Sequence, residues 1–129
     1  AYGLSNSCSK SNSGCSLERV RGGLLRFPAP SASGAPITDE QVGDAIIGMV
    51  RHEVSADGGM IINITLPNNS HLLNPGTVIR WVTEDKGRVY IHTYGEGTGF
   101  AGAINSALKH VVWDSSDKKA FDWATGSNQ

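Results

Sequence analysis

The chain has little of several residue types, and each shortage excludes a class of protein. Only 2 of its 129 residues are cysteine, too few for a fold held by several disulfides. Two cysteines without a nearby histidine also leave a zinc site incomplete. No apolar run approaches the roughly 20 residues of a membrane-spanning helix, so no such segment is expected. The start of the sequence is polar and lacks the basic-then-apolar pattern of a signal peptide.

An excess of charge of either sign is also missing. The 11 Lys and Arg residues nearly balance the 12 Asp and Glu residues, for a formal net charge of -1. This balance excludes a uniformly basic nucleic-acid coat, but it is compatible with a local basic patch, because catalysis needs a focused field. The length fits one domain with a modest core, and the 16 glycines indicate many turns.

Composition divides the chain near residue 36. Residues 1–16 are rich in Ser, Asn and Gly, and a Pro/Ser/Ala segment occupies 28–36, so 1–36 is expected to be a flexible arm or linker. Within it, Gly22-Gly23 are expected to end a short helix or strand. Cys8 and Cys15 are either a disulfide or two free thiols. Residues 37–129 are expected to form a compact domain.

Periodicity predicts the elements of this domain. Thr38 and Gln41 form a capping box, and apolar residues recur at helical spacing, so a helix is expected over 38–54, ended by 55–59. A strand is expected over 60–66, with Ile62, Ile64 and Leu66 on one face, and helices are expected over 100–112 and 116–123. The predicted fold class is α+β, a small antiparallel sheet with a central hairpin packed against one or two helices.

The hairpin lies over 77–94, and its turn decides which side chains share a face. A three-residue turn at Asp85-Lys86-Gly87 places Arg80 opposite His92, on one polar face. A two-residue Lys86-Gly87 turn slips the register by one residue and places Arg80 opposite Thr93. The first register is favoured because it separates polar from apolar residues more cleanly.

The candidate catalytic residues surround this hairpin. His71 and His92 are the types that serve as general acid and base near neutral pH, and Arg80 would stabilise a phosphoryl or acyl oxyanion. Glu96 is a second candidate base, and Thr93 a hydroxyl donor. The other two histidines, and the aspartates at 114, 117 and 122, are interpreted as structural or surface residues.

The loop at 95–99 could cradle an anion with successive backbone N–H groups before a helix. Its substrate-binding candidates are Gly97 and Thr98, joined by the neighbouring Tyr94 and by Lys109. The loop lacks the ending of a Walker motif. The chain also lacks HExxH and GxSxG motifs, and no metal site or cofactor is expected.

The residues at 71–80 and 92–99, followed by Asn105 and Trp113, resemble the C-terminal toxin domains of bacterial polymorphic toxins. Such domains end Rhs-type, contact-dependent-inhibition and type VI effectors. Within that group the pattern is similar to the metal-independent ribonucleases of the barnase–EndoU–colicin–RelE type. The resemblance implies that 37–129 is a toxin-like domain, secreted and acting in the cytoplasm of a target cell.

The implied reaction is RNA cleavage by transphosphorylation, with a cognate immunity protein as partner. His71 or Glu96 would take the proton of the 2′-hydroxyl, Arg80 would stabilise the phosphate, and His92 would protonate the leaving oxygen. The alternatives are another toxin enzyme (an ADP-ribosyltransferase, a DNase or a lipid hydrolase) and a non-catalytic binding module.

Overall fold

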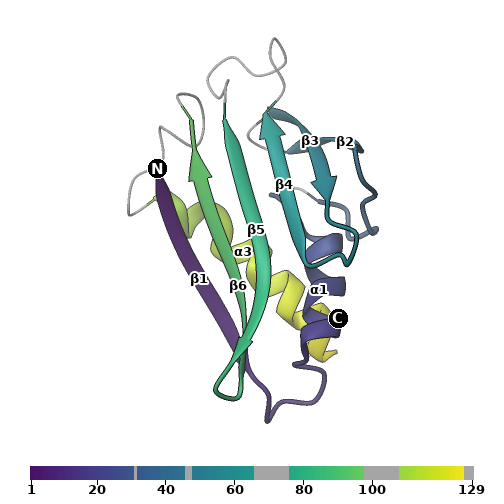
Figure 1. Cartoon of the computed structure of the whole chain (residues 1–129), viewed down its shortest axis with the longest axis vertical. Coiled ribbons are helices and arrows are strands. Elements are labelled where there is room, and N and C mark those ends of the chain that lie inside the picture. The colour runs from purple at the N-terminus through teal and green to yellow at the C-terminus, as the bar shows by residue number, and fades with distance from the viewer. Residues whose placement is uncertain (31, 46–47, 66–75, 98–107, 127–129) are drawn as a thin grey trace.

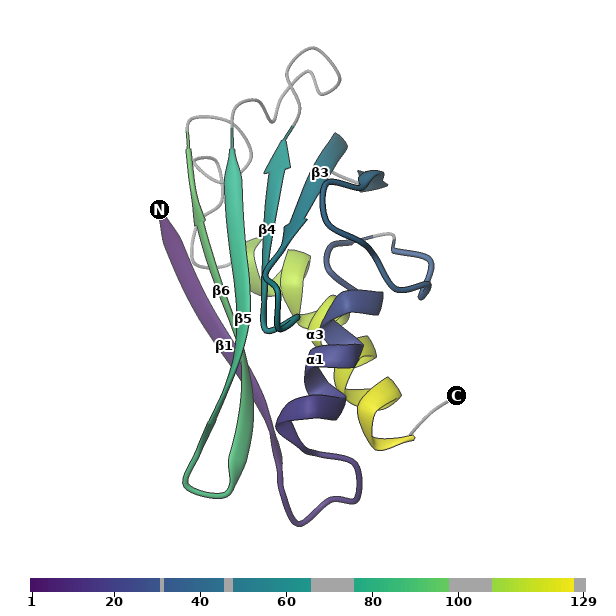
Figure 2. The same ribbon diagram turned by 45° about the vertical axis from the view of Figure 1, so that its right-hand side comes forward.

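One six-stranded antiparallel sheet carries both helices on the same face (Figures 1 and 2). The computed structural model describes residues 1–30, 32–45, 48–65, 76–97 and 108–126. In chain order its elements are β1 (Tyr2–Ser9), α1 (Leu17–Arg26), β2 (Val42–Ala45), β3 (Gly48–Val54), β4 (Met60–Thr65), β5 (Thr77–Asp85), β6 (Arg88–Glu96) and α3 (Leu108–Thr125). The strand order is β1-β6-β5-β4-β3-β2. The predicted α+β fold, a small antiparallel sheet with a central hairpin packed against one or two helices, is confirmed, and the described residues contain two helices.

The β5–β6 hairpin turns through two residues. Lys86 and Gly87 have φ values of 49° and 78°, and positive φ at both positions is what a type I′ turn requires. Arg80 therefore pairs with Thr93, and the favoured register, with Arg80 opposite His92, is wrong by one residue. The twist of a type I′ turn matches that of the flanking strands, and this gain outweighs the conformational cost of a positive φ at Lys86.

The N-terminal residues belong to the folded domain, in contrast to the flexible arm expected there. Strand β1 pairs with β6 along its whole length and forms one edge of the sheet. Helix α1 begins after Ser16, whose hydroxyl accepts a hydrogen bond from the backbone N–H of Arg19 at 3.2 Å. The helix then continues through Gly22-Gly23 to Arg26, where the sequence predicted an end.

The two glycines are where α1 packs against α3. A Cβ atom on Gly23 would collide with the backbone carbonyl of Ala120, and one on Gly22 would lie 2.9 Å from the Trp123 ring. Two arginines of α1 also flank that ring, with their guanidinium carbons 4.7 and 4.6 Å from its centroid. The glycines are therefore tolerated in the helix because they permit close packing.

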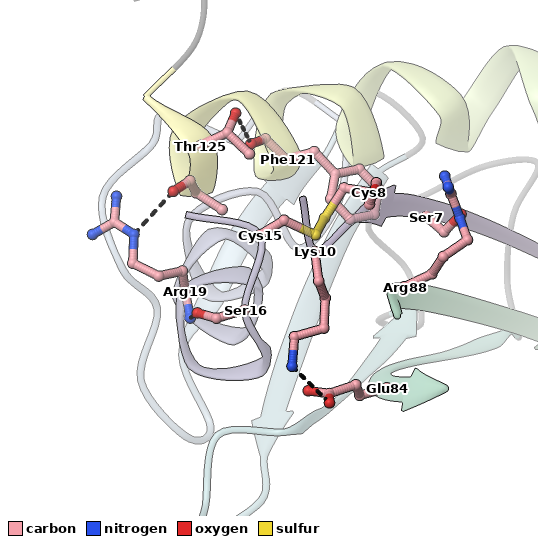
Figure 3. Close-up of a disulfide and its surroundings, with 12 residues drawn as sticks. Ser7, Cys8, Lys10, Cys15, Ser16, Arg19, Glu84, Arg88, Phe121 and Thr125 are labelled. Atoms are coloured by element: carbon pink, nitrogen blue, oxygen red, sulfur yellow. Dashed lines mark hydrogen bonds and ion pairs between the residues drawn. A yellow bond between two sulfur atoms is a disulfide. The ribbon is translucent and has the colours of Figure 1, made fainter. Parts of the chain in front are cut away.

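Cys8 and Cys15 form a disulfide that joins the end of β1 to the start of α1 (Figure 3). Both cysteines are buried in an apolar cluster with residues of α1, α3 and the central strands. Next to the disulfide, Lys10 pairs with Glu84 of the hairpin at 2.8 Å. The disulfide therefore fixes the entry into α1 against the hairpin end of the sheet.

The helix predicted over 38–54 is wrong, because β2 and β3 occupy this segment. The capping-box contact does form: the N–H of Thr38 donates to Oε1 of Gln41 at 3.0 Å. Glu40, however, has a φ of 65°, which ends any helical turn before Gln41. The strands that follow gain backbone hydrogen bonds from each other and from β4, so tertiary pairing overrides the helical spacing.

The C-terminal segment forms one helix where the sequence predicted two. Helix α3 is continuous from Leu108 to Thr125 and includes the expected break at 113–115. The earlier part of the first predicted helix, 100–107, lies outside the described residues. Among the described helices, none is both long enough and apolar enough to cross a membrane.

The close helix packing predicts that Gly23→Ala destabilises the protein. The added methyl group meets backbone rather than a movable side chain, so the expected loss in unfolding free energy is about 1–3 kcal/mol. Urea denaturation measures it. Gly3→Ala is the control, because a Cβ there meets the Thr93 oxygen at an ordinary 3.7 Å. Equal stability of the two variants would contradict the close contact.

The disulfide predicts a second stability change. Replacing both cysteines, as Cys8→Ala/Cys15→Ala, frees a short loop in the unfolded chain and should lower the unfolding free energy by about 2–3 kcal/mol. The same denaturation experiment, run on the wild type with and without a reductant, gives an independent value. A reductant that leaves the wild-type midpoint unchanged would show that the disulfide does not stabilise the fold.

Candidate functional site

Arg80 lies on the inner face of the sheet, fully buried beneath the helices. Its Nε donates to the hydroxyl of Thr93 at 3.1 Å, and Nη1 donates to the carbonyl oxygens of Phe27 and Pro28, both at 2.9 Å. Nη2 forms an ion pair with Oδ1 of Asp117 on α3. A buried guanidinium needs this full set of partners, because an unpaired charge in the interior is strongly destabilising.

Asp117 connects the ion pair to strand β1. Its second oxygen accepts a hydrogen bond from Nδ2 of Asn6 at 2.7 Å, and the same nitrogen donates to Asp114 at 3.0 Å. Asp114 also lies 3.1 Å from Nδ1 of His110, one turn earlier on the helix. This sequence of contacts runs from the buried ion pair to the exposed side of α3.

A second branch runs along the sheet to β3. Asn63 donates to the Pro28 oxygen at 3.1 Å, and its own oxygen lies 2.6 Å from Nδ1 of His52. Both side chains are buried. Because the amide oxygen can only accept, Nδ1 of His52 carries the proton. Burial also lowers the pKa of His52, which keeps the ring neutral.

Two aromatic residues complete the surroundings of Arg80. Its guanidinium carbon lies 5.0 Å from the centroid of the Trp113 ring, and the indole N–H of Trp113 donates to the hydroxyl of Tyr2 at 2.8 Å. Burial raises the pKa of Tyr2 to about 12, so the phenol stays neutral. Burial lowers the pKa of Arg80 to about 9, which leaves the guanidinium protonated at neutral pH.

His92 lies on the opposite, outer face of the sheet. Its ring stacks between those of Trp81 and Tyr90, at centroid distances of 5.1 and 5.7 Å. Nδ1 lies 2.6 Å from the hydroxyl of Ser5, and Nε2 lies 2.6 Å from the hydroxyl of Thr83. Partial burial lowers the pKa of His92. The structure therefore separates Arg80 from His92 by the thickness of the sheet and does not bring them to one anion site.

The remaining predicted site residues are dispersed. Thr93 is buried beside Arg80, whereas the hydroxyl of Tyr94 is exposed and donates to Glu96 at 3.3 Å. Lys109 donates to the backbone oxygen of Gly3 at 2.9 Å. Gly97 follows the end of β6. His71 and Thr98 lie outside the described residues.

A cavity of about 430 Å³ lies between helix α3 and the connection that follows α1. The connection contributes an apolar wall, and α3 contributes two valines, two serines and a lysine. The lining residues are Phe27, Ala29, Pro30, Ala32, Val111, Val112, Ser115, Ser116 and Lys119. Val111 is 73% exposed and forms the mouth, whereas Ser116 is buried. This arrangement suits an apolar molecule with a polar end.

Sequence reasoning missed the partners of Arg80, although two signals were present. Asp117 was interpreted as part of a solvated helix face, yet it is 1% exposed. It falls on a stripe with Trp113, Ala120 and Ala124, whose spacing of three and four marks the buried face of a helix. On β5, Arg80 alternates with two valines, which marks the inner face of a strand.

Among the described residues, no group of three or more His, Cys, Asp or Glu side chains could hold a metal ion. Arg80 and Asp117 are enclosed by protein, whereas Asp114 and His110 at the end of the network are partly exposed. The cavity beside α3 and the outer face around His92 are both accessible to a ligand.

The lowered pKa of His52 predicts a pH dependence of stability. The unfolded chain takes up a proton near pH 6.5 and the folded chain does not, so the unfolding free energy should fall as the pH drops below that value. His92 acts in the same direction. His52→Gln should make the decline between pH 7 and pH 5 shallower, as measured by denaturation at each pH. Identical declines would mean that His52 is not held neutral.

No family model matches the chain, and no curated protein sequence matches it. Solved structures do match in fold. XoxI from Bacillus cereus is 14% identical with a TM-score of 0.58, and the match covers 93% of each chain. NE0264 from Nitrosomonas europaea is 9% identical with a TM-score of 0.50, over 96% of this chain and 94% of that one. Ara h 8.0201 is 7% identical with a TM-score of 0.52, over 98% and 99%. At these identities the likeness is one of fold alone.

Proposed function

We propose that this chain is a non-catalytic binding domain for a small, mostly apolar molecule with one anionic end. The observation that carries the proposal is the cavity of about 430 Å³ beside α3. Small-molecule sites typically have volumes of about 300–1,000 Å³, with mainly apolar walls and a few polar groups that orient the ligand. The cavity fits both criteria.

The polar end of the ligand would lie against α3. Ser115, Ser116 and Lys119 supply the polar atoms of the lining, and all three come from this helix. Lys119 is exposed, and among the described residues it forms no ion pair. A carboxylate or sulfonate at this end would gain a charge-assisted hydrogen bond from the ammonium group.

The endoribonuclease predicted from the sequence is the alternative. Its phosphate site would have to lie on the outer face with His92, because Arg80 is enclosed on the inner face. There, both ring nitrogens of His92 already face hydroxyl groups. The secreted toxin role, the RNA substrate and the immunity protein rest on the resemblance in sequence, and the binding proposal needs none of them.

The binding proposal predicts that Val111→Asp weakens ligand uptake. A carboxylate at the mouth of the cavity repels an anionic ligand and removes apolar contact, so affinity for anilinonaphthalene sulfonate should fall by about tenfold, or 1.4 kcal/mol. Fluorescence titration of the whole chain measures this. Met60→Asp is the matched control, because Met60 is also an exposed apolar residue but lies on the other face of the sheet, on β4.

Two further measurements separate the alternatives. Lys119→Ala should lower the affinity for the sulfonate probe but leave the affinity for the neutral probe phenylnaphthylamine unchanged.

The purified chain should leave total RNA intact, and so should the His92→Ala variant. Wild-type protein that binds neither probe would refute the binding proposal, and RNA cleavage abolished by His92→Ala would establish the ribonuclease instead.

A further inference from the structure

The two walls of the cavity are joined by a side chain that does not line it. The connection after α1 forms the first wall, and α3 forms the second. Arg80 projects from strand β5 behind both walls and is fully buried, so a ligand in the cavity would not touch it. Arg80 nevertheless contacts both walls of the cavity.

The first wall is held through its backbone. Nη1 of Arg80 donates to the carbonyl oxygens of Phe27 and Pro28, both at 2.9 Å. Nδ2 of Asn63, on β4, donates to the same Pro28 oxygen at 3.1 Å. Ala29, which follows at once in the chain, lines the cavity and is buried. The start of this wall is thus tied to the sheet by three hydrogen bonds.

The second wall is held through a side chain of α3. Nη2 of Arg80 pairs with Asp117, the neighbour of the lining residue Ser116. The Trp113 ring, one turn earlier, packs against the guanidinium with its centroid 5.0 Å from the central carbon. The same planar group therefore contacts both the connection and the helix.

Because the guanidinium of Arg80 is rigid, it acts as a spacer between the two walls of the cavity. Its nitrogens diverge in one plane at fixed angles, so the wall bound to Nη1 and the wall bound to Nη2 cannot separate without breaking the hydrogen bonds of Nη1 or the ion pair of Nη2. We propose that Arg80 is a positioning residue that sets the width of the cavity and thereby the size of the ligand that it accepts. This inference rests on the proposed binding function.

Lysine at this position provides the distinguishing change. It retains the positive charge beside Asp117, but its compact ammonium group on a flexible stem cannot hold four acceptors in a fixed plane. In Arg80→Lys the connection loses the two hydrogen bonds from Nη1 and keeps only the one from Asn63, while the lining residues stay unaltered. The cavity then accepts longer ligands than in the wild type.

The test is the chain-length preference for straight-chain saturated carboxylates from hexanoate to tetradecanoate. Each is measured by displacement of phenylnaphthylamine from the whole chain. The wild type should prefer one length, and Arg80→Lys should change the affinity ratio of the longer to the shorter carboxylates by about tenfold in favour of the longer ones. Val82→Ala is the matched control: it removes buried volume from the same strand, in the apolar cluster around the disulfide.

The ratio separates positioning from general stability. If Arg80 had only a structural role, Arg80→Lys would lower the affinity for carboxylates of every length by the same factor, as expected for Val82→Ala. An unchanged affinity ratio in Arg80→Lys therefore overturns the inference. Should Arg80→Lys fail to fold, Asn63→Ala removes one tie to Pro28, together with the contact to His52, and should shift the ratio in the same direction by a smaller factor. Wild-type protein that binds no carboxylate and no phenylnaphthylamine refutes the proposed function itself, a result distinct from an unchanged ratio.

Discussion

The ion pair between Arg80 and Asp117 is the constraint around which the interior is arranged. Two charges withdrawn from water are stable only when every remaining donor and acceptor is matched. The other hydrogen-bonding partners of the ion pair come from separate parts of the chain: the Thr93 hydroxyl, the carbonyls of residues 27–28 and the amide of Asn6. The network holds the sheet, the connection after α1 and helix α3 in one relative position.

Because Arg80 is buried, the candidate binding site is the cavity beside α3 rather than the outer face of the hairpin. Arg80 was expected to meet a phosphate, but its donors are already occupied by protein acceptors and Asp117. His92, on the other face, stacks between two aromatic rings and contacts two hydroxyl groups. The cavity beside α3 combines an apolar wall with an exposed lysine, and its walls are positioned by the polar network behind it.

Local sequence patterns predicted the elements whose stabilising contacts are close in the chain. The strand predicted over 60–66 is present as β4, Met60–Thr65, and the hairpin was found because β-branched and aromatic residues bracket a turn. The helix predicted over 38–54 was wrong because its capping signal and apolar spacing compete with pairing to strands farther along the chain. On β4 the apolar Ile62 and Ile64 were expected on one face, but Ile61 and Asn63 are the buried residues, since the interior here is partly polar.

The sequence by itself determined the α+β class and the existence of the hairpin, because turn chemistry and alternation are local properties. It also left two hairpin registers open, and the tertiary structure decided between them. Only the fold could decide that Arg80 is buried and that residues 2–26 belong to the folded domain, since the partners of Arg80 lie up to 53 positions away and those of residues 2–26 up to 111. A charged residue is compatible with the interior or with solvent, and which one it occupies depends on whether distant acceptors converge on it.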